Sequence, residues 1–434
     1  MEERENKNKF WKGVLVGALI TAFCAMAVVG IASGIWLVAR SAKGKAQGVS
    51  EGSVGSNVIA EHEVTEEEME LYEIGYKLDY IEKLIDTYFL FDEETEREDP
   101  MDWMYIGYVA SLRDPYSSYY SEEEYQSLIE SKEGEYCGIG VMVSQNVYTG
   151  LVTVVKVFKD APADVAGMLP GDIITAVEGM DISGMDLSLV VSDHIKGEEG
   201  TDVSLTVYRE SIDDYVDLTM TRRIVQNPTV EFEMLEEKIG YIELSSFEDV
   251  STEQFIGAVD ALEEQGMEGL ILDLRNNGGG VVNAAEDIAD YLIPDGKDIV
   301  SFKGKGVEDS TYVAKDGHQL DIPMVVLVNG QSASASEVLT GALKDHGIAT
   351  VVGTNTFGKG IAQGIFPLPD GSALKLTTAY YYVPSGECIH EKGIEPDVVV
   401  ELDEELETLV EIPKDEDNQL RAAIDALLNG KETN

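Results

Sequence analysis

The chain has 434 residues, of which 44% are apolar, and it carries a formal net charge of −51. This length suits two or three domains, and so negative a charge argues against nucleic acid as a partner and predicts repulsion from anionic lipid. The three cysteines, Cys24, Cys137 and Cys388, fit neither a disulfide framework nor a zinc motif. A bond between Cys137 and Cys388 would require the two regions around them to be adjacent.

Residues 13–39 predict a membrane anchor. They form a run of 27 positions without a charged side chain, and a spanning helix needs about 20 residues. No small-x-small cleavage site follows before Arg40, so we interpret the run as a single-pass transmembrane helix and not as a cleaved signal peptide. Residues 1–12 then form a cytoplasmic head, and 40–64, rich in Gly, Ser and Ala, form a flexible linker. Basic residues on both sides of the run favour this orientation only weakly.

Two helical patterns follow the linker. Apolar side chains recur at helical spacing over 65–85, with acidic residues on the other face, and a second pattern runs over 101–112. The turn sequence Asp-Pro-Tyr-Ser-Ser, at 114–118, ends the second helix. We expect residues 65–133 to form an N-terminal helical region.

Residues 134–224 predict a β-rich module. Three strand-like runs lie in it, at Val152–Val157, 172–177 and 203–207. The loop Gly138-Ile139-Gly140 precedes the first run, and the segment APADVAGMLPGD at 161–172 follows it. Loop and segment in this order resemble a PDZ domain. The resemblance implies that backbone N–H groups of Gly138, Ile139 and Gly140 bind the C-terminal carboxylate of a peptide that adds as an edge strand.

The next stretch, 225–400, alternates strands with helices, which argues for an α/β core. The pattern predicts strands at 240–245, 269–274 and 374–383, and a helix capped by Ser251 or Thr252 after the first strand. The second strand ends in Arg275 followed by Asn-Asn-Gly-Gly-Gly, and such a glycine run lets backbone N–H groups approach a ligand closely. We expect a C-terminal tail at 401–434, with a short helix at 415–428.

The stretch 324–363 contains the candidate catalytic residues. Met324–Val328 is a short apolar run that predicts a buried strand, and a turn leads from it into Ser334 at the start of a helix. A hydroxyl there lies among free backbone N–H groups at the positive end of the helix dipole, where an oxyanion is stabilised. The glycine-framed loop 353–360 then presents a single cation, Lys359. We predict that Ser334 is a nucleophile and Lys359 its general base.

Simpler interpretations of these residues remain open. Ser334 and Glu337 also fit a capping box, in which a serine and a glutamate three positions later cap a helix. The loop GTNTFGKG nearly matches a phosphate-binding loop, but Gly360 stands where the Mg²⁺-binding Ser or Thr belongs. A Ser–His–Asp hydrolase with His346 beside Asp345 is a third alternative, although neighbours on a helix point about 100° apart.

Four features together resemble the carboxy-terminal processing proteases, a Ser–Lys family that includes the bacterial tail-specific proteases: SASASE at 332–337, Asp345, FGKG at 357–360 and Gln363. In that family the middle serine of SASASE is the nucleophile, the lysine follows 25 positions later, and a glutamine four positions further orients the lysine. This spacing falls on Ser334, Lys359 and Gln363. The resemblance covers roughly residues 66–400.

The resemblance implies a ClpP/crotonase-like α/β protease core at 225–400, with the PDZ domain inserted between it and the helical region. It also implies an oxyanion hole formed by the N–H groups of Gly279 and Ala335, an extracytoplasmic catalytic part and a homodimer paired through the N-terminal helices. No cofactor or metal is expected, and related anchored enzymes act in signalling across envelopes. The family usually carries DPHS where this chain has Asp-Pro-Tyr-Ser, so Tyr116 departs from the pattern in a segment that we interpret as structural.

The chemistry sets one condition on Lys359. A lysine acts as a general base only when it is neutral, so its pKa must fall well below the usual value of about 10.4 through burial away from carboxylates. Gln363 is uncharged and can hold the amine without stabilising the ammonium form. We therefore predict a membrane-anchored serine endopeptidase that cleaves protein substrates near their C-termini, with its PDZ domain recognising their tails. The alternative is a catalytically silent PDZ scaffold at the cell membrane.

Overall fold

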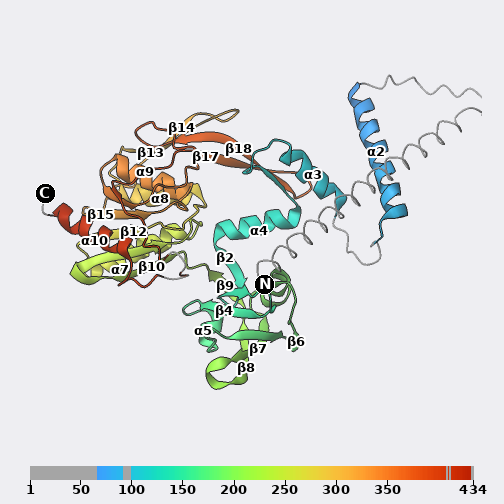
Figure 1. The fold of residues 1–434 in the computed structure, drawn as a ribbon, viewed down its shortest axis with the longest axis horizontal. Helices are drawn as coiled ribbons and strands as arrows, with labels where there is room; N and C mark the ends of the chain where they lie inside the picture. The colour runs from blue at the N-terminus through green and yellow to red at the C-terminus, as the bar shows by residue number, and fades with distance from the viewer. Residues whose placement is uncertain (1–65, 91–98, 407–408, 410–411, 432–434) are drawn as a thin grey trace, which may run out of the picture. The chain divides into compact units, whose positions relative to one another are not determined.

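The computed structural model describes residues 66–90, 99–406, 409 and 412–431 (Figure 1). It divides into two units, Met1–Arg97 and Glu98–Asn434. The expected transmembrane helix at 13–39, with the head at 1–12 and the linker at 40–64, lies outside the described residues. Among the helices that are described, none combines the length and the apolar character that a membrane crossing requires.

The first unit contributes one described helix, α2 (Glu66–Tyr88), where the sequence predicts a helix over 65–85. Several of its large apolar side chains are exposed, among them Ile74, Tyr76 and Leu84. The predicted apolar stripe, to which Ile74 and Leu84 belong, is therefore not fully covered by other described residues.

The second unit begins with short, well-capped elements: α3 (Pro100–Ala110), β1 (Ser118–Tyr120) and α4 (Glu122–Glu133). The carboxylate of Asp99 caps α3 by accepting a hydrogen bond of 2.8 Å from the N–H of Met101. Ser121 and Glu124 form a capping box at the start of α4. These side chains occupy N–H groups that a helix leaves unpaired at its first turn, which explains where both helices begin.

A β-rich module follows. Its strands are β2 (Glu135–Gly138), β3 (Val141–Gln145), β4 (Val152–Val157), β5 (Ile173–Val177), β6 (Met180–Asp181), β7 (Asp202–Arg209), β8 (Asp214–Thr221) and β9 (Arg223–Gln226). An antiparallel sheet runs in the order β3-β4-β5-β7-β8 with β6 beside β5, while β2 pairs with β9. The carboxylate of Asp172, only 1% exposed, accepts two hydrogen bonds of 2.8 and 2.7 Å from Arg209. This bidentate pair holds the end of the 161–172 segment against β7.

The α/β core is built on a second sheet, in the order β10-β11-β12-β15-β16-β19 (Figure 1). Its strands are β10 (Val230–Met234), β11 (Ile239–Leu244), β12 (Gly269–Asp273), β15 (Met324–Val328), β16 (Ala349–Gly353) and β19 (Val398–Val399). All neighbours pair in parallel except β10, which is antiparallel to β11. The core helices are α7 (Ser251–Glu264), α8 (Val282–Leu292), α9 (Ala335–Asp345) and α10 (Asn418–Lys431).

Helices cover both faces of this sheet, which explains why its strands are apolar throughout. On β12, the side chains of Leu270 and Leu272 pack with α7, α8 and α9, while Ile271 between them packs with α10. Residues on β15 alternate in the same way. Successive strand residues point to opposite faces, so a continuous apolar run fills two separate cores.

A third sheet, entirely antiparallel, stands beside the core in the order β1-β18-β13-β14, with β17 also on β18. Its remaining strands are β13 (Asp298–Gly304), β14 (Ser310–Val313), β17 (Ile361–Pro367) and β18 (Ala373–Tyr382). In the pairing of β1 with β18, Ser118 lies opposite Lys375. The turn before β1 is thereby brought next to the strands that follow the lysine loop.

Two local expectations need correction. Ser251 does not cap α7 but is its first residue, and its Oγ accepts a hydrogen bond of 2.8 Å from the N–H of Glu248. Cys137 and Cys388, between which the sequence left a bond open, are free thiols. The expected C-terminal helix begins at Asn418, because Asp417 accepts hydrogen bonds from the N–H groups of Gln419 and Leu420.

Candidate active site

Ser334 stands where the chain turns from the buried strand β15 into α9. Its backbone has φ 58° and ψ −113°, a positive φ that residues other than glycine rarely adopt. The residue is 8% exposed, so its hydroxyl lies in a recessed position at the start of the helix. Such strained backbone is concentrated at functional sites, where the surrounding structure holds it in place.

The carboxylate of Glu337 holds this strained residue. Glu337 is fully buried, and its Oε2 accepts hydrogen bonds from the N–H groups of Ser334 at 2.8 Å and Lys359 at 2.9 Å. Its Oε1 accepts from the Thr356 hydroxyl at 2.6 Å and from the N–H of Gly358 at 2.7 Å. The capping interpretation of Glu337 is thus correct but incomplete, because the same carboxylate fastens the lysine loop to the start of α9.

Tyr381 on β18 also supports this junction. It is 1% exposed, and its hydroxyl donates to the carbonyl of Ser334 at 3.1 Å and lies within reach of the carbonyl of Lys359. Burial, followed by the charge of Glu337, raises the pKa of Tyr381 well above its ordinary value. The phenol therefore remains protonated and serves as a donor between the backbones of the two predicted catalytic residues.

Lys359 meets the main electrostatic condition for a general base. Burial lowers its pKa below the ordinary lysine value, and the positive charge of Lys375 lowers it further, while Glu337 and Asp114 raise it. Our expectation of a site free of carboxylates is therefore wrong. The Glu337 carboxylate is tied to neutral donors rather than to the amine, and burial of Lys359 has the larger effect.

The predicted Ser–Lys–Gln constellation is gathered in one region, but its side chains do not engage one another. Over the described residues, no hydrogen bond joins Ser334 Oγ to Lys359 Nζ; instead Nζ lies 4.8 Å from the ring centroid of Tyr116. The amide of Gln363 donates to the carbonyl of Ile361 and to the hydroxyl of Thr377, each at 3.4 Å. Catalytic hydrogen bonds in substrate-free enzymes are often long and tighten only in the complex.

The glycine loop after β12 lies directly against Ser334. A Cβ atom built on Gly279, which has φ 98°, would come within 2.7 Å of the Ala333 carbonyl oxygen and within 2.9 Å of both the Ala335 nitrogen and Ser334 Cβ. No other residue fits at this position. The two predicted oxyanion donors, the N–H groups of Gly279 and Ala335, are therefore close neighbours beside the nucleophile.

Asn277 is a residue of this site that the sequence analysis missed. It is fully buried, and its Oδ1 accepts a hydrogen bond of 2.9 Å from the N–H of Gly279. Its Nδ2 donates to the carbonyl of Leu244 at 2.7 Å, and its own carbonyl accepts from the Ser336 hydroxyl at 2.8 Å. Asn277 thus ties the glycine loop to α9, and one of the expected oxyanion donors is occupied in this structure.

The two competing sequence interpretations find no geometric support. The Nε2 of His346 is 2.7 Å from the carbonyl of Asp298, and the carboxylate of Asp345 accepts from the N–H of Ser385 at 2.8 Å, so Asp345 does not orient His346 towards Ser334. The loop 353–360 leads into strand β17. A phosphate-binding loop requires a helix at that point.

The predicted peptide-tail loop begins where β2 ends at Gly138. The side chain of Ile139 is 1% exposed and packs in the core of the β-rich module, and Gly140 has φ 77°. Burial raises the pKa of the Tyr136 phenol to about 12, against the opposing effect of the Val141 and Gly140 N–H groups beside it. One donor that the PDZ resemblance assigns to a substrate carboxylate, the N–H of Gly140, thus neighbours a phenol of the same chain.

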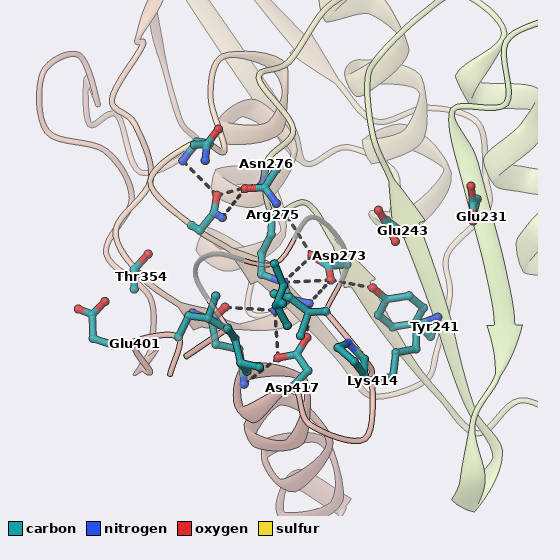
Figure 2. A pocket seen from close by; sticks show the side chains of 18 residues that line it. Glu231, Tyr241, Glu243, Asp273, Arg275, Asn276, Thr354, Glu401, Lys414 and Asp417 are labelled. Carbon is teal, nitrogen blue, oxygen red and sulfur yellow. Dashed lines mark hydrogen bonds and ion pairs between the residues drawn. The ribbon is translucent and has the colours of Figure 1, made fainter. Parts of the chain in front are cut away.

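A cavity of about 970 Å³ lies at the carboxyl ends of the core strands, and Figure 2 shows it from close by. Ser334 and Lys359 are not among its lining residues. Within it, the guanidinium of Arg275 donates to Asp273 Oδ2 at 2.6 Å and to Asp417 Oδ2 at 2.8 Å, while the Tyr241 hydroxyl donates to Asp273 at 2.8 Å. This network connects the helix α10 to the residue that precedes the Asn-Asn-Gly loop. Across the described parts of the chain, no cluster of His, Cys, Asp or Glu is arranged to hold a metal ion.

Comparison with known proteins gives matches over both modules. The model of peptidase family S41 matches residues 238–400, and a PDZ domain model matches residues 137–220. A carboxy-terminal-processing protease of Bartonella bacilliformis is 40% identical over 301 residues, which cover 68% of this chain and 68% of that protein. A carboxyl-terminal-processing protease of Synechocystis sp. is 36% identical over 74% of this chain and 75% of that protein. The carboxy-terminal processing protease CtpA of Bacillus subtilis is 35% identical over 71% of this chain and 66% of that protein.

Proposed function

The chain belongs to the carboxy-terminal processing proteases of peptidase family S41 and is a serine-type peptidase, and from this premise we propose that Ser334 is its nucleophile and Lys359 the general base that activates it. The family is the one that the SASASE and FGKG motifs predict. One observation carries the assignment of the two residues. The backbone N–H groups of Ser334 and Lys359 donate to the same carboxylate oxygen of the buried Glu337.

The reaction would proceed in two balanced stages. Neutral Lys359 takes the proton of the Ser334 hydroxyl as Oγ attacks the carbonyl carbon of the scissile peptide bond. The resulting ammonium returns that proton to the leaving amine, the C–N bond breaks, and an acyl ester on Ser334 remains. Water, deprotonated by Lys359, then attacks the ester and releases the acid and the free hydroxyl.

The negative oxygen of each tetrahedral intermediate would be bound by the N–H groups of Gly279 and Ala335. The close approach of Gly279 to Ser334 supports this assignment. The N–H of Gly279 must first leave the Oδ1 of Asn277, to which it donates here. Gln363 is assigned to orient the amine of Lys359, for which its lack of charge suits it, and the short path along β17 from residue 359 to 363 supports this role.

The PDZ domain is proposed to recognise the C-terminal tail of a protein substrate through the loop Gly138-Ile139-Gly140. The tail would add as a strand beside β3, and its carboxylate would compete with the Tyr136 phenol for the N–H of Gly140. We further assign residues 13–39 to a single-pass membrane anchor that places the PDZ and protease domains outside the cytoplasm. The uncharged length of this run supports the anchor.

A homodimer paired through the N-terminal helices completes the proposal. Exposed aromatic side chains on α3, such as Trp103 and Tyr108, support it.

The assignment is tested by Ser334→Ala and Lys359→Ala in the full-length chain, with casein hydrolysis and fluorophosphonate labelling as readouts. Each variant is expected to lose at least about 10³-fold in kcat/KM, because members of a catalytic unit fail together. His346→Ala is the matched control and is expected to keep wild-type activity and labelling. Thermal unfolding establishes that all three variants are folded. Hydrolysis by either dyad variant at the wild-type rate, or a wild-type chain that is not labelled at Ser334, would overturn the assignment.

A further inference from the structure

The turn 114–117 lies over the amine of Lys359 and has no part in the mechanism above. The Lys359 ammonium nitrogen is 4.8 Å from the ring centroid of Tyr116, within the range of cation–π attraction. Tyr116 is half-buried, and Lys359 is also half-buried. Attraction between a cation and an aromatic face is stronger when both are partly removed from water.

The turn is held rigidly in this place. The carboxylate of Asp114 accepts hydrogen bonds from the N–H of Tyr116 at 3.1 Å and from the Ser117 hydroxyl at 2.6 Å. The Ser117 oxygen in turn accepts from the N–H of Thr377 on β18 at 3.1 Å. Because the next residues pair with β18 as strand β1, the ring of Tyr116 is presented to the lysine by a fixed backbone and not by a loose surface loop.

The ring distinguishes between the two protonation states of the amine. An aromatic face carries a negative quadrupole and attracts an ammonium ion, whereas a neutral amine gains almost nothing from it. The other charged groups that face Lys359 are Lys375 on β18, Glu337 on α9 and Asp114 in the turn itself. The contact with Tyr116 therefore acts with the two carboxylates and against Lys375 and burial.

We propose that Tyr116 is a positioning residue of this site: its ring holds the protonated amine of Lys359 in the substrate-free enzyme and raises the pH at which the lysine becomes available as a base. This inference rests on the proposed role of Lys359. It also explains why the amine lies on an aromatic ring in this structure while the Ser334 hydroxyl is not bonded to it. The amine must leave the ring before it can accept the serine proton.

The experiment compares three variants of the full-length chain. Tyr116→Leu removes the aromatic face and keeps apolar bulk over the lysine, whereas Tyr116→Phe keeps the face. Tyr312→Leu removes a ring on β14 whose centroid lies 5.5 Å from the amine of Lys315, and it serves as the matched control. The first readout is competitive acetylation with acetic anhydride across pH, followed by mass spectrometry of the peptide that contains Lys359, and it does not depend on catalysis. The second is the pH profile of kcat/KM for a peptide substrate.

In Tyr116→Leu, we expect Lys359 to be acetylated about 2- to 30-fold faster than in the wild type at pH values below its midpoint, and the acid limb of the kcat/KM profile to move to lower pH. Tyr116→Phe should keep the wild-type midpoint in both readouts, and so should Tyr312→Leu. If Tyr116→Leu does not fold, Tyr116→Met makes the same comparison.

An unchanged or slower acetylation of Lys359 in Tyr116→Leu would overturn the inference, and so would a Tyr116→Phe chain that behaves like Tyr116→Leu. Failure of the proposed function has a different signature. In that case Lys359→Ala would hydrolyse substrate at the wild-type rate, whatever the acetylation experiment shows.

Discussion

Two groups of buried carboxylates hold this molecule together in different ways. At the candidate active site, Glu337 accepts four hydrogen bonds from three backbone N–H groups and one hydroxyl, all of them uncharged. At the C-terminal helix, Asp273 and Asp417 both bind the guanidinium of Arg275. The side chains in this second group are 3–11% exposed, whereas Glu337 is fully buried, so both clusters are largely removed from water.

The difference between the two clusters follows from the charge that each site requires. Arg275 pairs with both of its carboxylates, and although burial lowers its pKa, Asp273 and Asp417 raise it above the ordinary arginine value, so the guanidinium stays charged at every usable pH. At the active site, an arginine or lysine paired with Glu337 would stabilise a fixed ion pair in the same way. Neutral donors instead position two backbones and leave the Lys359 amine without an ion-pair partner on Glu337.

The largest effect should come from breaking the charged network. Arg275→Met leaves two buried carboxylates without their cationic partner and is expected to lower the free energy of unfolding by about 3–5 kcal/mol. Urea-induced unfolding measures the loss. Lys392→Ala, which breaks an exposed pair of 2.9 Å with Glu387, is the control and should cost less than about 1 kcal/mol. Equal effects of the two substitutions would show that the Arg275 network does not stabilise the fold.

Glu337→Gln tests the network of neutral donors around the Glu337 carboxylate. It should cost about 2–4 kcal/mol in unfolding free energy, because one acceptor oxygen becomes an NH₂ group that faces N–H and O–H donors. We also expect casein hydrolysis to fall by at least about 100-fold, since the loop that carries Lys359 loses its attachment to α9. Glu286 provides the matched control, because it is a glutamate that is 2% exposed and whose pKa burial, together with Asp287, raises to about 7. Glu286→Gln should not destabilise the fold at pH 8, where the native carboxylate is ionised at a cost. Full activity of Glu337→Gln would contradict the role assigned to this residue.

The smallest effect should come from Lys375, whose charge lowers the pKa of Lys359. Lys375→Gln removes that charge, so the pKa of Lys359 rises and less of it is neutral at a given pH. We expect the acid limb of the kcat/KM profile to move to higher pH and the rate below the midpoint to fall about 2- to 10-fold. Lys303→Gln on β13 removes an equal charge elsewhere and should leave the midpoint where it is. A shift in the opposite direction would mean that another group governs the acid limb.

Local patterns in the sequence were sufficient for much of the fold. The apolar run at Met324–Val328 predicted a buried strand, and the structure places it in the centre of a parallel sheet. The glycine run after Arg275 predicted a close backbone approach, and Gly279 lies against Ser334. These features could be predicted from the sequence because each depends on residues within a few positions of one another.

The contacts that could not be predicted from the sequence join residues that are far apart along the chain. Glu337 reaches the loop 19 to 22 positions later, Asn277 meets Ser336 across 59 positions, and Arg275 binds Asp417 across 142 positions. From the sequence we interpret Tyr116 as structural, whereas the contact of its ring with Lys359 depends on the pairing of β1 with β18. No periodicity or spacing encodes such pairs, because they exist only once the order of strands in the sheets is set.

The amino-acid sequence alone was enough to identify the protease family, the position of the serine at the start of a helix and the lysine in its glycine-framed loop, since motif and spacing are local properties of the chain. Only the tertiary structure determined the environment of these residues: which groups surround the lysine, where its amine lies and which donor of the oxyanion site is already hydrogen-bonded. The physical reason is that burial, charge and hydrogen-bond partners act through space, and the strands that bring these residues together are far apart along the chain.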